Sequence, residues 1–190
     1  ALQYLDAHTS HPATAVVTDS CCDLPDAMLR KLGVHVVPLL LGSGQTEYLD
    51  RLTISPELFW ELSGQKGTFP RTSQPPAASF DRLYSGLLAH YENVLSVHLA
   101  SALSGTCEAA HRSAQKIDDT KITVVDSRHL SASLGLVVYR LATAIRDGMD
   151  ADEAKKLLPE WSKKARQFVS VTSLKYMVRG GRVSPLKGAI

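Results

Sequence analysis

Short apolar runs and longer amphipathic segments alternate along most of the chain. Four apolar runs are typical of strands buried inside a protein, and they span residues 13–19, 34–41, 93–101 and 121–127. Five segments carry apolar residues at helical spacing, at residues 24–33, 54–64, 76–91, 104–117 and 131–148. This repeated alternation predicts an α/β fold in which a parallel sheet is flanked by helices.

Residues 54–64 carry clear signals for the start and end of a helix. Ser55 suits the N-cap, Pro56 suits the first helical position and Gly64 suits a helix end. We therefore expect a helix whose first turn begins at Pro56.

A change of pattern after residue 148 predicts a division of the chain into parts. Residues 1–12 are interpreted as a tail or linker, and residues 13–148 as an N-terminal α/β domain that carries the binding site. Residues 149–190 open with a charged helical segment and continue into an apolar stretch that is broken by Gly180-Gly181. We expect this last part to be the incomplete start of a second α/β domain.

Charge and composition narrow the class of function. The chain has 21 Lys and Arg against 19 Asp and Glu, a net charge of +2, and its basic residues are scattered, which argues against a nucleic-acid surface. No apolar run approaches the ~20 residues of a membrane span. Three cysteines without a disulfide framework favour a reducing, cytoplasmic setting. Neither they nor the seven histidines have metal-ligand spacing, so we expect no metal.

Polar residues follow three of the predicted strands. Asp19-Ser20 closes the first strand, residues 101–106 follow the third, and Asp126-Ser127 closes the fourth. Ligands of open α/β sheets bind beyond the carboxyl ends of the strands, so we expect a site at this edge. Either aspartate could serve as a base, as a metal ligand or as an ordinary turn residue.

Two hydroxyl-bearing segments are candidates for binding an anion. Ser104-Gly105-Thr106 lies where an apolar strand runs into a helix, and the free N–H groups and helix dipole there suit a carboxylate or a phosphate. Thr72-Ser73 precedes two prolines that hold the chain extended. Either segment could instead only cap the following helix. The presence of two such segments favours an anion site.

The sequence lacks several familiar catalytic motifs. It contains no G-x-S-x-G nucleophile elbow, no G-x-x-x-x-G-K-[ST] loop and no G-x-G-x-x-G turn. A hydrolase that combines Ser104, a histidine and Asp126 stays open as an alternative, as does a phosphatase that uses a Ser or Asp at a strand end.

Six short motifs occur in the order seen in one known family. They are VVTDSCCDLP, VHVVPLLL, TSQPP, LASALSGT, VVDS and LKYMVRGGRVS. In this respect residues 13–190 resemble the DegV family of fatty-acid-binding proteins. Carried over by motif, Thr72 and Ser104 would hydrogen-bond the carboxylate of a fatty acid, and Ser73 with the Gly105-Thr106 backbone would complete the cradle.

The resemblance gives a secondary, site-shaping role to further residues. Ala100 stands where the family commonly has the first of two serines, so Ser101 is a secondary candidate. The other members of this set are Asp19, Ser20, Asp126, Ser127, Gly180, Gly181 and Arg182. The two glycines are expected to allow a positive φ or close packing.

The resemblance also implies a carrier rather than an enzyme. The family is similar to the lipid-binding subunits of bacterial fatty-acid kinases, which hold a fatty acid while a separate kinase subunit phosphorylates its carboxylate. A long-chain fatty acid would be the ligand, and a fatty-acid kinase subunit would be the partner. The family usually continues through a C-terminal part that helps to enclose the acyl chain. A regulatory module with a structural lipid is a further interpretation.

Overall fold

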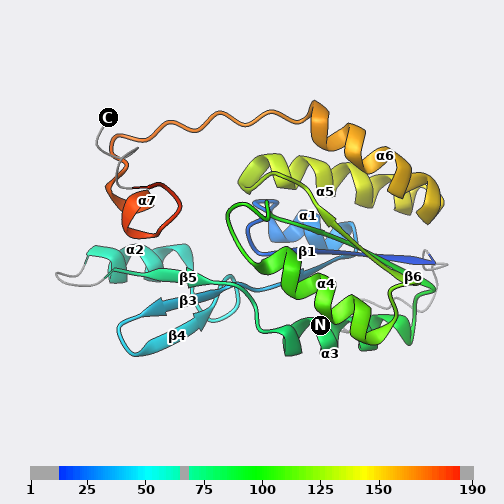
Figure 1. Ribbon diagram of the computed structural model, residues 1–190, viewed down its shortest axis with the longest axis horizontal. Coiled ribbons are helices and arrows are strands. Elements are labelled where there is room, and N and C mark those ends of the chain that lie inside the picture. Colours follow the sequence, from blue (N-terminus) through cyan, green and yellow to red (C-terminus); the bar gives the residue numbers. More distant parts are fainter. Residues whose placement is uncertain (1–12, 65–68, 185–190) are drawn as a thin grey trace.

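A four-stranded parallel sheet lies at the centre of the molecule (Figure 1). The computed structural model describes residues 13–64 and 69–184. The strand order is β2-β1-β6-β7, with β1 (Thr14–Asp19), β2 (Val34–Val37), β6 (Asn93–His98) and β7 (Ile122–Asp126). Every residue of β1 is buried, because this strand lies inside the sheet and has helices on both faces. The predicted parallel sheet is confirmed.

Helices cover both faces of this sheet. One face carries α1 (Asp26–Lys31), α5 (Ser131–Arg146) and α6 (Ala151–Lys164), and the other carries α3 (Ala77–Leu88) and α4 (Thr106–Ile117). Successive strand residues point to opposite faces. Val16 and Leu95 accordingly pack in the cluster with α5 and α6, whereas Val17 and Val94 pack with α3 and α4.

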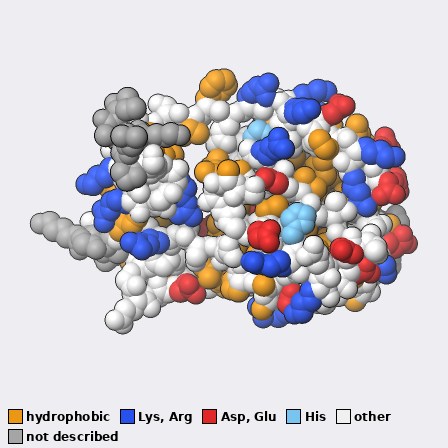
Figure 2. Space-filling view, viewed as in Figure 1, with side chains coloured by type: hydrophobic (Ala, Val, Ile, Leu, Met, Phe, Trp, Pro, Cys, Tyr) orange, Lys and Arg blue, Asp and Glu red, His pale blue; other side chains and the backbone are white. Residues whose placement is uncertain are grey.

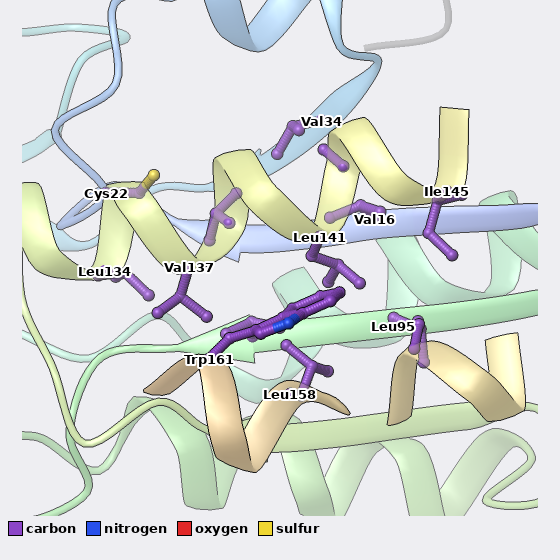
Figure 3. Packing of buried hydrophobic residues seen from close by; sticks show 14 of the residues in the cluster. Val16, Cys22, Val34, Leu95, Leu134, Val137, Leu141, Ile145, Leu158 and Trp161 are labelled. Carbon is purple, nitrogen blue, oxygen red and sulfur yellow. The ribbon is translucent and has the colours of Figure 1, made fainter. Parts of the chain in front are cut away.

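Helix α6 shares the hydrophobic core of α5. Leu158 and Trp161 of α6 lie in one buried cluster with Leu141 of α5, as Figure 3 shows. The helix begins after Asp150, whose carboxylate accepts the N–H groups of residues 152 and 153. Residues 151–164 thus pack on the parallel sheet, although they follow the predicted domain boundary. The division into domains stays a prediction.

A second, smaller sheet lies to one side of the parallel sheet. Its strands are β3 (Leu40–Ser43), β4 (Thr46–Leu49) and β5 (Arg71–Ser73), which pair antiparallel in the order β4-β3-β5. Helix α2 (Pro56–Gly64) and the short helix α7 (Lys175–Arg179) lie at the same end of the molecule (Figure 1). We call β3, β4, β5 and α2 the small lobe.

The single strand predicted over residues 34–41 is wrong. The run breaks at Pro38, which has no N–H to donate to a ladder. The N–H of Leu39 donates instead to Ser20 Oγ at 3.0 Å. As a result β2 stays in the parallel sheet, and β3 begins the antiparallel one.

The predicted start of the 54–64 helix is confirmed. Ser55 Oγ accepts the N–H of Leu58 at 3.2 Å, and α2 begins at Pro56.

The apolar stretch after residue 167 has one regular element within the described residues, the helix α7. Phe168 in this stretch is 96% exposed. The predicted tail, residues 1–12, lies outside the described residues. Of the helices in the described part of the chain, none is both long and apolar enough to cross a membrane.

Candidate functional site

A cavity of about 170 Å³ lies beyond the carboxyl ends of β1 and β6, where the small lobe meets the parallel sheet. Its walls are formed by Cys21, Leu39, Thr72, Ser73, Leu99, Leu103, Ser104, Leu130 and Arg182. The four leucines make one part of the wall apolar, and the hydroxyls and the guanidinium make another part polar. Pockets for small molecules are typically ~300–1,000 Å³, so this cavity suits a polar head group and the first part of a longer ligand.

A larger hollow of about 640 Å³ lies between α5 and α6. Its lining includes Leu136, Tyr139 and Trp161, and it contains none of the site residues that the sequence predicts. We place the candidate site at the smaller cavity, because polar groups from several elements converge there.

Ser104 and Thr106 form the start of helix α4. Ser104 Oγ lies 2.9 Å from Thr106 Oγ1 and accepts the Thr106 N–H at 3.3 Å. Thr106 is fully buried, whereas Ser104 is half-buried and lines the cavity. Gly105, not Ser104, is the N-cap residue of this helix. Ser104 Oγ thus satisfies the N–H of the first helical residue and also lines the cavity.

Thr72 and Ser73 reach the cavity from strand β5. Both are exposed, and their backbones pair with Leu41 and Leu40 of β3. Thr72 and Ser73 of one hydroxyl-bearing segment thus line the same cavity as Ser104 of the other, although the two segments are far apart in the sequence. The small lobe positions one of them and the parallel sheet positions the other.

Gly105 is in close contact with the segment that carries these hydroxyls. A Cβ at this position would lie 1.8 Å from Gln74 Oε1, so only a glycine leaves room for the Gln74 side chain as it lies here. The φ of Gly105 is −75°, so the requirement comes from space and not from backbone conformation. The contact joins the end of β5 to the start of α4.

Asp19 is fully buried at the end of β1 and accepts three hydrogen bonds. Its Oδ1 accepts the N–H of Cys21 at 3.0 Å, and its Oδ2 accepts the N–H of Leu99 at 2.9 Å. His98 Nδ1 is 3.0 Å from the same Oδ2. Because Cys21 and Leu99 both line the cavity, the Asp19 carboxylate fixes two of its walls.

The network continues from His98 into the core. His98 Nε2 is 2.7 Å from Ser96 Oγ, which accepts the hydroxyl hydrogen of Tyr84 at 2.8 Å. All these bonds are satisfied when Ser96 donates to Nε2 and His98 Nδ1–H donates to Asp19. The order of groups resembles a Ser-His-Asp triad, but Ser96, His98 and Asp19 are fully buried. They form a core network without access for a substrate.

The other predicted strand-end residues are engaged locally. Ser101 donates to Asp126 through its hydroxyl at 2.5 Å and through its N–H at 3.3 Å. Ser127 is buried and accepts the N–H of His129 at 3.0 Å. Ser20 Oγ accepts the N–H of Leu39, a cavity residue. These contacts shape the loops, and neither Ser101 nor Asp126 lines the cavity itself.

The glycine-rich turn after α7 brings a cation to the cavity. Gly181 has a φ of +78°, and a Cβ at Gly180 would lie 3.2 Å from Tyr176 O. Arg182 donates from Nε to Leu103 O at 3.4 Å and from Nη1 to Gly180 O at 2.7 Å. Figure 2 shows Lys and Arg side chains on the side of the molecule that carries α7.

Cys21 contributes a neutral wall to the cavity. Burial, with smaller contributions from Asp19, Asp50 and Asp23, raises the pKa of its thiol to about 12. The thiol therefore stays protonated near neutral pH and acts as a small apolar group. No group of three or more His, Cys, Asp or Glu side chains suited to a metal ion occurs in the described part of the chain.

Several cavity residues were missed by reasoning from the sequence. They are Cys21, Leu39, Leu99, Leu103 and Leu130. A leucine or cysteine near a strand end is as typical of the core as of a binding site, so the residue type alone does not mark these five. Their position directly after β1, β2 and β6 or before α5 was the available clue.

Comparisons with known proteins identify the family of the chain. The model of the uncharacterised proteins of the DegV family matches residues 13–190. A DegV domain-containing protein of Clostridium perfringens is 31% identical over 169 residues, which are 89% of this chain and 61% of that protein. The chain thus spans about 61% of the length of this relative.

Solved structures show the same fold. A fatty-acid-binding DegV family protein from Thermus thermophilus is 35% identical with a TM-score of 0.79, over 88% of this chain and 60% of that one. DegV of Bacillus subtilis, a fatty-acid-binding protein, is 30% identical with a TM-score of 0.86, over 90% of this chain and 61% of that one. With its parallel sheet, its second sheet and its match across residues 13–190, this chain belongs to the DegV family.

Proposed function

We propose that the chain binds a long-chain fatty acid and holds its carboxylate at the polar end of the cavity. Thr72, Ser73 and Ser104 would donate hydrogen bonds to the carboxylate. The observation that carries this proposal is the convergence of the three hydroxyls, from strand β5 and from the loop between β6 and α4, on one cavity with a leucine-rich wall. The fatty-acid-binding relatives of known structure support the proposal, because this chain shares their family and fold.

Neutral donors suit a head group that must stay reactive. A hydroxyl or an N–H at the start of α4 holds a carboxylate without a tight ion pair. Arg182 at the rim already donates to two carbonyl groups, so its main contribution would be long-range attraction of the anion. The carboxylate would keep an oxygen available for chemistry by another protein.

The tail of the fatty acid would supply most of the affinity. Each buried methylene is worth ~0.8 kcal/mol, and four leucines line the cavity. A cavity of about 170 Å³ encloses only the part of the tail next to the carboxylate. The head group would fix the orientation, and the remaining tail would lie beyond these lining residues.

Such a protein would act as a cytoplasmic carrier and not as an enzyme. It would present the bound acid to a fatty-acid kinase subunit, which would form the acyl phosphate. Ser104 supports this division of labour, because its hydrogen-bond partner within the described residues is Thr106 and not a histidine that could activate it.

Analysis of the bound lipid tests the proposal directly. The protein would be purified, denatured, extracted with organic solvent and analysed by mass spectrometry. One fatty acid per chain is the expected result. Protein that carries no fatty acid, binds none on addition and hydrolyses acyl or phosphate esters would instead favour a hydrolase or phosphatase.

Single substitutions test the assignment of the donors. We expect Thr72→Ala and Ser104→Ala each to weaken fatty-acid binding about fivefold, as loss of one hydrogen bond worth ~1 kcal/mol would do. Thr46→Ala on β4 and Ser85→Ala on α3 are matched controls, because both residues are exposed and lie outside the cavity lining. Unchanged affinity in both test variants would remove the assignment.

A further inference from the structure

The turn between β4 and α2 places an arginine in an unusual backbone conformation. Arg51 has a φ of +64°, a region that residues with a side chain seldom adopt. The turn is closed by the N–H groups of Leu52 and Thr53, which donate to Leu49 O at 3.1 and 2.9 Å. Such a conformation persists where the surrounding contacts hold it. In addition to these backbone hydrogen bonds, the side chain of Arg51 makes contacts of its own.

The Arg51 guanidinium reaches from the small lobe to the loop that follows β1. Its Nη1 donates to Cys22 O at 2.7 Å, and its Nη2 donates to Leu24 O at 2.8 Å. Nη2 also forms an ion pair with Asp26 Oδ1 at 2.5 Å. The planar group with its fixed fork of donors is suited to three acceptors at once.

The same turn also contacts Leu39, another residue of the cavity wall. The N–H of Asp50, next to Arg51, donates to Leu39 O at 2.9 Å. Leu39 lines the cavity from the connection between β2 and β3, and Cys21, next to Cys22, lines it from the loop after β1. One short segment is therefore bonded to Leu39 on one side and to the loop after Cys21 on the other.

We propose that Arg51 is a positioning residue that ties the turn after β4 to the loop after β1 and so, together with the bond from the Leu39 N–H to Ser20 Oγ, holds the Leu39 and Cys21 parts of the cavity wall in place. Arg51 does not line the cavity, and it acts on the ligand only through Leu39 and Cys21. The proposal rests on the proposed fatty-acid binding. Its expected consequence is slow release of the ligand, since loosening one wall would open the cavity.

Two substitutions distinguish the effect of the Arg51 guanidinium bonds from the effect of the positive φ in the turn. Arg51→Gln removes the guanidinium and keeps a side chain at positive φ. Arg51→Gly also removes the guanidinium, but it favours the positive φ. Arg146→Gln is the matched control, because Arg146 is an exposed arginine that pairs with Asp147 at 3.3 Å, away from the cavity.

The experiment measures dissociation of a fluorescent fatty acid by stopped flow, together with hydrogen exchange of the ligand-free proteins. Both Arg51 variants should release the ligand roughly tenfold faster than the wild type, because changes within one site act mainly on dissociation. Both should also show faster exchange for the amides of residues 21–26, with unchanged exchange in β1 and β6. The Arg146→Gln control should match the wild type in both measurements.

Three results would overturn the proposal. One is wild-type release in Arg51→Gln. Another is a return to wild-type release in Arg51→Gly, which would assign the effect to the turn and not to the guanidinium. The third is faster exchange throughout the parallel sheet, which would indicate general destabilisation. If the wild type binds no fatty acid, the proposed function fails. The hydrogen exchange of residues 21–26 then still tests whether the Arg51 guanidinium holds this loop.

Discussion

Gly105 is the position where an added side chain would meet a neighbour most directly. A Cβ there would lie 1.8 Å from Gln74 Oε1, and the Gln74 side chain would have to turn away. Because the exposed Gln74 side chain can move, we expect Gly105→Ala to lower the free energy of unfolding by at most ~1 kcal/mol. Because the conflict involves one side chain, Gln74→Ala should recover most of this loss in the double variant. Urea unfolding of the four proteins would measure the coupling, and strictly additive effects would contradict it.

His35 should make stability sensitive to mild acid. Burial lowers the pKa of its imidazole below 6.5, and its Nε2 has no hydrogen-bond partner within the described residues. The unfolded chain therefore binds the proton more readily than the folded chain does. Stability is fully present above about pH 6.5 and falls as the pH drops from there toward the folded pKa.

Replacement of this histidine tests the pH effect. His35→Phe keeps a ring against Tyr91, whose ring now lies 6.0 Å away in an edge-on contact. Thermal unfolding between about pH 5 and about pH 8 should show a flatter profile for this variant than for the wild type. His111→Phe is the control, because His111 is exposed on α4 and should leave the slope unchanged. An equal slope in all three proteins would dismiss His35 as the cause.

Strands β1 and β6 are joined at their carboxyl ends by one buried carboxylate. Asp19 of β1 accepts the N–H of Leu99, which follows β6, and pairs with His98. Asp19→Asn keeps one acceptor oxygen in place of two, so either the N–H of Cys21 or the donors from Leu99 and His98 lose their acceptor, and we expect a loss of ~3 kcal/mol in stability. Asp147→Asn, at an exposed position, should change stability little. A loss below about 1 kcal/mol in Asp19→Asn would mean that the network is dispensable.

The sequence allowed the parallel sheet and its helices to be predicted, but not the small lobe. Strands such as β1 and β6 are buried along all or nearly all of their length and give mostly apolar runs. β5 has three residues, all exposed, so no apolar pattern marks it. The hairpin of β3 and β4 did offer a signal, since Gly44 has a φ of +63° in a two-residue turn. That signal is weak where the flanking strands are short and partly exposed.

The candidate site forms where the small lobe meets the parallel sheet, so the sequence could predict only part of it. Hydrophobic and polar patterns placed Ser104 at a strand end, where an anion site is a general expectation. Thr72 and Ser104 line the same cavity, and Gln74, close to Thr72 in the sequence, lies against Gly105; no local pattern encodes this contact. The sequence offered the Thr72 segment as a second hydroxyl-bearing candidate, and the family resemblance gave both hydroxyls a role at a carboxylate. The role of Arg51 depends on a contact to residues more than 25 positions away and was not foreseen.

The size of the cavity between the two sheets leads to a prediction about how affinity depends on the length of the fatty acid. Each methylene that enters it should strengthen binding about fourfold, as ~0.8 kcal/mol per buried methylene requires. With about 170 Å³ available, the gain should end after the first methylenes and affinity should then rise slowly. Titration of saturated acids from butanoate to octadecanoate, each followed by the rise in melting temperature, would locate the break.

The methyl esters of the same acids serve as the control for the head group. An ester keeps the tail but lacks the anion, so it should lose the attraction of the α4 N-terminus and of Arg182 at every length. Esters that bind as well as the acids would show that the tail alone is recognised. A series that keeps rising fourfold to the longest acid would show that far more of the tail is enclosed than the cavity lined by Leu39, Leu99, Leu103 and Leu130 can hold.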